Sequence, residues 1–267
     1  MPSSAASDVY KRQGQPPDSA TELRRWLGYP LFLESYLKYS ADRDTVSDCL
    51  ATAFAVIDLV HEKRQSSGLL PALGPLSASR ATITAAGAAR AASRLFDVFS
   101  MERESRATAE CFDSLLESTL SCWSEERQLY HEGDDETKYT QLTNVLALCF
   151  GLADEARQQQ ILTAMRGPGV EAVRGLNEAF YLVDGLWQAR AYRRAMQSLQ
   201  LHWGRRLERK GSTWLDKRSL RERPAGAVPG PAYFLSLIHI SEPTRRTPRA
   251  YAVFCLKKKR GGGGGGG

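Results

Sequence analysis

Apolar residues recur along most of the chain at the three- and four-residue steps that are typical of amphipathic helices. Between Asp44 and Lys63, one helix face would collect Val46, Cys49, Leu50, Ala53, Phe54, Ile57 and Val60. Asp42 or Asp44 can cap the start of this helix, and Gly68 follows its end. The spacing therefore predicts a long helix with one buried face.

The same spacing predicts further helices, joined by short turns that contain Gly, Pro or Asp. The expected set is Glu22–Tyr39, Asp44–Lys63, Ser79–Phe99, Glu102–Trp123, Tyr139–Gly151, Glu155–Met165, Val170–Arg190 and Ala191–Glu208. Almost no alternating strand pattern occurs before Leu215, and the spacing is too irregular for strict tetratricopeptide or ankyrin repeats. The sequence predicts an all-α fold of about eight helices that pack as hairpins.

The two ends of the chain carry stretches that are related as complementary DNA strands. Leu235–Ile240, LSLIHI, can be encoded ctg tct ctt ata cac atc, and the reverse complement, gat gtg tat aag aga cag, encodes DVYKRQ, the sequence of Asp8–Gln13. Both stretches resemble translated transposase adapters from sequencing libraries, and Gly261–Gly267 resembles poly-G read-through. We expect residues 1–13 and 235–267 to be adapter-derived, disordered and outside any domain, and residues 14–234 to form the folded part.

The basic charge of the chain depends on those two ends. The whole sequence has 36 Lys and Arg against 30 Asp and Glu, a net charge of +6. Nine of the basic and two of the acidic residues lie in the flanks, which leaves 27 basic and 28 acidic residues between them. A net charge of −1 gives no reason to expect a nucleic-acid partner, and the absence of an apolar run of eighteen residues argues against a transmembrane helix.

Other candidate chemistry between the flanks is sparse. His61, His131 and His202 are far apart and lack the spacing of metal ligands, so no metal or other cofactor is predicted. His131 precedes Glu132 in an acidic turn that we expect to be solvated. None of the cysteines forms a C-x-x-C pair, and we expect them to act as small apolar residues; they are Cys49, Cys111, Cys122 and Cys149.

Four stretches form an ordered set of motifs. They are YPLFLESYLKYSADRDTVSDCLATAFAVIDLVHEKRQSSGLL (Tyr29–Leu70), LYHEGDDETKYTQLTNVLALCFGLAD (Leu129–Asp154), HWGRRLERKGSTWLD (His202–Asp216) and GPAYF (Gly230–Phe234). In that order they resemble the catalytic domain of α-L-rhamnosidases, glycoside hydrolase family 78. The resemblance covers nearly all of residues 14–234 and implies a partial (α/α)6 toroid of the six-hairpin glycosidase type.

The resemblance also implies a substrate and a reaction, the inverting hydrolysis of a terminal α-L-rhamnoside. Such hydrolysis needs a general acid and a general base, with carboxyl groups roughly 6.5–9.5 Å apart. Counted without a gap from Trp203, the family's general base falls on Asp216, where the family has Glu. Trp214 offers an aromatic face on which a sugar can stack, and Gln141 and Asn144 are candidate sugar contacts.

Each of these residues also has a structural alternative. Asp216 can cap or solvate a loop, and Trp214 can pack in the core. Gln141 and Asn144 can cap a helix or form hydrogen bonds within the helix bundle. The sequence alone leaves these alternatives open.

The chain departs from the family in ways that affect its expected activity. The family's general acid lies upstream of the first stretch, before Gly14, so we expect this polypeptide to be an inactive fragment. The His and Trp of the last family motif fall on Ala225 and Ala227, and the stretch after Leu70 lacks the family's aromatic-plus-Asp pair. Two other functions stay open: a non-enzymatic helical-hairpin scaffold that binds proteins, and a carbohydrate-binding pseudoenzyme.

Overall fold

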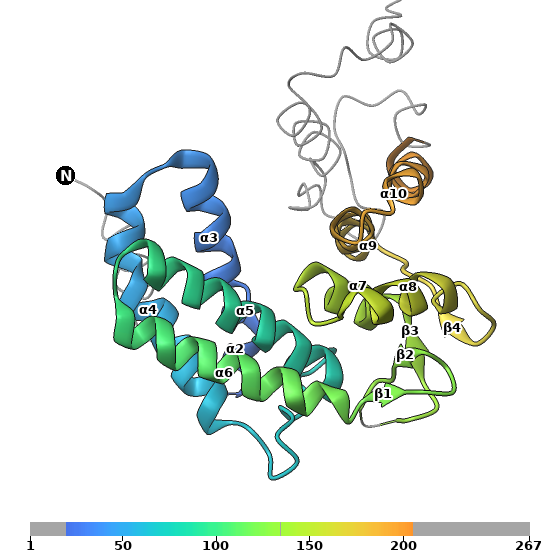
Figure 1. Cartoon of the computed structure of the whole chain (residues 1–267), viewed down its shortest axis with the longest axis horizontal. Helices are drawn as coiled ribbons and strands as arrows, with labels where there is room; N and C mark the ends of the chain where they lie inside the picture. Colours follow the sequence, from blue (N-terminus) through green and yellow to red (C-terminus); the bar gives the residue numbers. More distant parts are fainter. Residues whose placement is uncertain (1–19, 134, 205–267) are drawn as a thin grey trace, which may run out of the picture. The chain divides into compact units, whose positions relative to one another are not determined.

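The computed structural model describes residues 20–133 and 135–204, and these residues are mainly helical (Figure 1). All of the described residues lie within one compact unit. The helices are α2 (Ala20–Trp26), α3 (Tyr29–Ser40), α4 (Arg43–Glu62), α5 (Ala78–Val98), α6 (Glu102–Leu120), α7 (Gln141–Cys149), α8 (Glu155–Ala164), α9 (Leu176–Gln188), α10 (Tyr192–Leu199) and the π-helical turn η1 (Gln200–Gly204). Within the described residues every expected helix is present, so the predicted all-α class is confirmed. The last four residues of the expected helix Ala191–Glu208 lie outside the described part of the chain.

The first expected helix, Glu22–Tyr39, is divided in two. A turn at Leu27 and Gly28 separates α2 from α3. Pro30 lies in the first turn of α3, where its missing N–H would have no intrahelical partner in any case. The break places Leu27 in the core, with 1% of its surface exposed.

Two pairs of very short strands replace the ends of three expected helices. β1 (Trp123–Ser124) pairs antiparallel with β2 (Leu129–Tyr130), and β3 (Tyr139–Thr140) pairs parallel with β4 (Val170–Glu171). The expected helices had extended through Trp123 and had begun at Tyr139 and Val170. A strand of two residues is too short to show alternation, so the sequence pattern could not reveal it.

The core is built around α5, whose buried face consists mainly of alanine. The fully or almost fully buried residues of this face include Ala81, Ala85, Ala86, Ala88, Ala89, Ala91 and Ala92. Helix α5 packs along α6 (Figure 1) and also contacts α3, α4 and α7. Alanine has a short side chain, which allows several neighbouring helices to approach the same helix closely.

The remaining helices continue the chain of contacts. Helix α7 packs against α9, and α9 packs against α10.

Asp42 caps α4, because its carboxylate accepts a hydrogen bond from the backbone N–H of Thr45 at 3.1 Å. Among the described helices, none combines the length and the apolar character that crossing a membrane requires.

Candidate functional site

The residues expected at the sugar site fall into two groups. Asp216 and Trp214 lie outside the described residues. Gln141 and Asn144 both lie at the beginning of α7, where their surroundings can be examined.

Gln141 connects the start of α7 to two backbone segments that follow later in the chain. Its Nε2 atom donates a hydrogen bond to the carbonyl of Met165 at 3.1 Å, and its Oε1 atom accepts one from the N–H of Val173 at 3.2 Å. The side-chain amide therefore holds the segment that follows α8 and the segment that precedes α9 against α7.

Asn144 is fully buried and its amide is occupied by backbone groups. Its Oδ1 atom accepts a hydrogen bond from the N–H of Tyr130 at 2.8 Å, while Nδ2 donates to the carbonyls of Tyr130 at 3.0 Å and Thr140 at 2.9 Å. The two bonds with Tyr130 tie β2 to α7. Direct contact of Gln141 or Asn144 with a sugar stays a prediction.

Next to them lies a buried carboxylate that the sequence analysis missed. Glu132 and His131 were expected in a solvated turn, but they are only 2% and 7% exposed. Oε1 of Glu132 accepts hydrogen bonds from the hydroxyls of Thr140 and Thr143, each at 2.6 Å. The other oxygen, Oε2, accepts from the hydroxyl of Ser77 and from Nε of Arg80, the latter at 3.0 Å. We call these five residues the Glu132 network: Ser77, Arg80, Glu132, Thr140 and Thr143.

The Glu132 network joins the N-terminal ends of two helices. Ser77 is the N-cap residue of α5 and Thr140 is the N-cap residue of α7. Each cap hydroxyl accepts a hydrogen bond from a backbone N–H of its own helix, and each donates its hydrogen to Glu132. A negative charge is favourable at a helix N-terminus, and here one carboxylate serves two of them.

The environment of Glu132 favours the ionised form. Burial by itself would raise the pKa of this carboxyl, but hydrogen bonds from Ser77, Thr140 and Thr143 and the charge of Arg80 outweigh it and lower the pKa. Each carboxylate oxygen of Glu132 also accepts hydrogen bonds from two donors, so its lone pairs are already engaged. Glu132 is therefore suited to fixing the two helix ends and poorly suited to transferring a proton.

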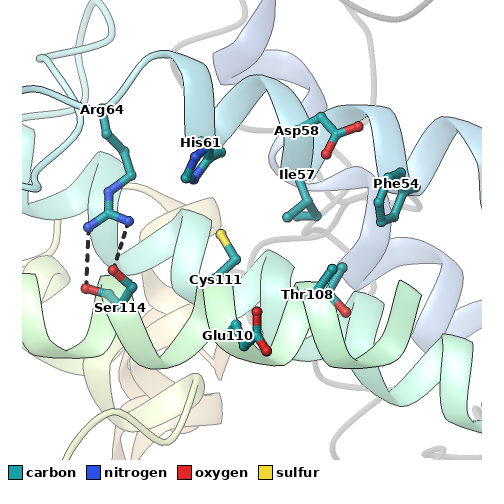
Figure 2. Close-up of a pocket in the computed structure, with 10 residues that line it drawn as sticks. Phe54, Ile57, Asp58, His61, Arg64, Thr108, Glu110, Cys111 and Ser114 are labelled. Atoms are coloured by element: carbon teal, nitrogen blue, oxygen red, sulfur yellow. Dashed lines mark hydrogen bonds between the residues drawn. The ribbon is translucent and has the colours of Figure 1, made fainter. Parts of the chain in front are cut away.

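A separate pocket of about 270 Å³ lies between α4 and α6. Figure 2 shows Asp58 and His61 on one helix facing Thr108, Glu110 and Cys111 on the other. Burial, reinforced by the charge of Glu62, raises the pKa of Asp58. Within the described ranges, no group of three or more His, Cys, Asp or Glu side chains has an arrangement that could hold a metal ion.

The fold resembles solved rhamnosidases. A rhamnosidase from Klebsiella oxytoca with rhamnose bound matches with a TM-score of 0.67 and 16% identity, over 79% of this chain and 46% of that one. A family 78 rhamnosidase of Bacillus sp. GL1 matches with a TM-score of 0.66 and 18% identity, over 79% of this chain and 26% of that one. No family model and no curated protein matches the sequence.

The chain spans less than half the length of either solved rhamnosidase. At 16% and 18% identity the likeness concerns the fold. It confirms the fold that the four sequence motifs implied: the chain has the helical-hairpin fold of part of the family 78 rhamnosidase structures.

Proposed function

We propose that the chain is part of the catalytic domain of an inverting glycoside hydrolase that acts on terminal α-L-rhamnosides. The likeness in fold to two rhamnosidases, one of which has rhamnose bound, is the observation that carries this proposal. The ordered motifs of the sequence, from Tyr29 to Phe234, support it independently.

In this proposal Asp216 is the general base that deprotonates the attacking water. Inversion requires this water to fit between the base and the general acid, on the opposite face of the sugar ring from the leaving group. Trp214 would provide an apolar face for the sugar ring. Gln141 would act close to the substrate, either by direct contact or by fixing the backbone around it, and Asn144, which is fully buried, would act by fixing the backbone.

The resemblance assigns the general acid to a segment upstream of Gly14. Glu132 does not replace it, because its carboxylate is ionised, buried and already hydrogen-bonded by four donors. We therefore propose that this polypeptide alone does not hydrolyse rhamnosides.

A chromogenic aryl α-L-rhamnoside tests both parts of the proposal. The chain as it stands should show no turnover above the background rate. The natural full-length protein that contains this segment should hydrolyse the substrate, and Asp216→Asn in it should reduce kcat by about a hundredfold or more. Turnover by the chain alone would contradict its inactivity, and a full-length protein without rhamnosidase activity would contradict the function.

One observation favours a second candidate, a carbohydrate-binding pseudoenzyme. Asp216 stands where the family has Glu, and its carboxyl group is one methylene shorter, a displacement that can cost on the order of a hundredfold in rate. Asp216→Glu in the full-length protein separates the two functions. A pseudoenzyme that is inactive only because the Asp216 carboxyl group is too short would gain activity in this variant. A pseudoenzyme that also lacks other catalytic groups would gain none. An active enzyme adapted to Asp216 would instead lose rate.

We also propose that residues 14–234 carry the function and that both flanks are translated adapter DNA. A chain trimmed to residues 14–234 should keep the thermal midpoint and any sugar affinity of the full chain. A fall in either quantity on trimming would show that the flanks contribute to the folded protein.

A further inference from the structure

We draw no further inference here: the strongest candidate, the pocket between α4 and α6 that is lined by Asp58, Glu110 and Cys111, carries nothing, because it amounts to exposed carboxylates beside a lone cysteine, and none of the buried polar atoms that lack a hydrogen-bond partner among the described residues lines it.

Discussion

Gly185 of α9 lies directly against the backbone of Val145 on α7. A Cβ atom added to Gly185 would come within 2.7 Å of the carbonyl oxygen of Val145. This distance is shorter than the distances that Cβ atoms keep from other heavy atoms in real structures. The neighbour is backbone inside a helix, so it cannot move aside as the end of a flexible side chain could. The absence of a side chain at this position sets how closely α7 and α9 pack.

Gly185→Ala should therefore destabilise the protein although it improves helix propensity. Alanine gains roughly 1 kcal/mol over glycine in a helix interior, whereas overpacking costs typically about 1–3 kcal/mol and more where backbone must shift. We expect a net loss of about 1–2 kcal/mol in the free energy of unfolding, measured by urea denaturation.

Gly175→Ala, at the N-cap of the same helix, is the control for that substitution. No heavy atom lies within 4 Å of the added Cβ, and φ is −111°, which alanine adopts readily. Its cost should stay below about 1 kcal/mol, the scale of the preference of an N-cap for glycine over alanine. If the Gly185→Ala variant is as stable as wild type, the result would contradict the close packing of α7 against α9 at Gly185.

The helices could be predicted from the sequence because each repeats its pattern over several turns. Along α4, for example, the period is repeated often enough to show which face is buried. The strand pairs could not be predicted, because β3 and β4 depend on contact between Thr140 and Glu171, which are distant in the sequence. The break at Gly28 was also missed, since the apolar spacing continues across it.

The site was harder to predict than the fold. Glu132 looked like a surface residue because it stands among acidic neighbours, but its partner Ser77 lies 55 positions earlier. The usable local signals were Gly133, which adopts a φ of +78°, and the threonines at positions 140 and 143. Neither signal indicates burial unless the packing of α5 against α7 is known.

Removing the charge of Glu132 should destabilise the fold. Glu132→Gln places an amide N–H₂ against hydroxyl or guanidinium donors and leaves the charge of Arg80 without its partner. Loss of one member of such a buried pair costs about 2–4 kcal/mol. Urea denaturation at pH 7 measures the loss, and Glu171→Gln, which breaks an exposed pair with Arg174, should change stability by less than about 0.5 kcal/mol.

The same variant should reveal the pH dependence of this interaction. Because folding lowers the pKa of Glu132, its contribution is present above the pKa of an unfolded glutamate, about 4.3, and is lost as the pH falls through the lower pKa of the folded state. The difference in unfolding free energy between wild type and Glu132→Gln should therefore be constant from pH 7 to about 5 and shrink below about 4. A difference that does not change with pH would show that folding does not lower the pKa of Glu132.

Arg64 should contribute more to the free energy of unfolding than an exposed surface arginine does. It donates to the Ser114 hydroxyl at 2.9 Å, as Figure 2 shows, and to the Ser118 hydroxyl at 3.0 Å, so it ties the segment after α4 to α6. Its Nε atom also holds the carbonyl of Gly68 at 2.9 Å. Arg64→Ala should lower the free energy of unfolding by about 1–3 kcal/mol.

Two comparisons make this prediction specific. Arg64→Lys keeps the charge but cannot reach Gly68 and α6 together, so it should recover less than half of the loss. Arg94→Ala removes an exposed ion pair with Glu34 and should cost less than about 0.5 kcal/mol. Equal stability of the Arg64→Ala and Arg94→Ala variants would contradict the bridging role.

Cys111 should resist alkylation in the folded protein although it lines the pocket between α4 and α6. Burial raises the pKa of its thiol to about 11, so at pH 8 only about one thiol in a thousand is the reactive thiolate. Cys49 is half-buried and serves as the internal comparison. We expect iodoacetamide to modify Cys111 about tenfold or more slowly than Cys49 in the native protein, and both at similar rates in urea. Peptide mapping by mass spectrometry measures each site, and equally fast native labelling would show that the pocket opens and exposes the thiolate of Cys111.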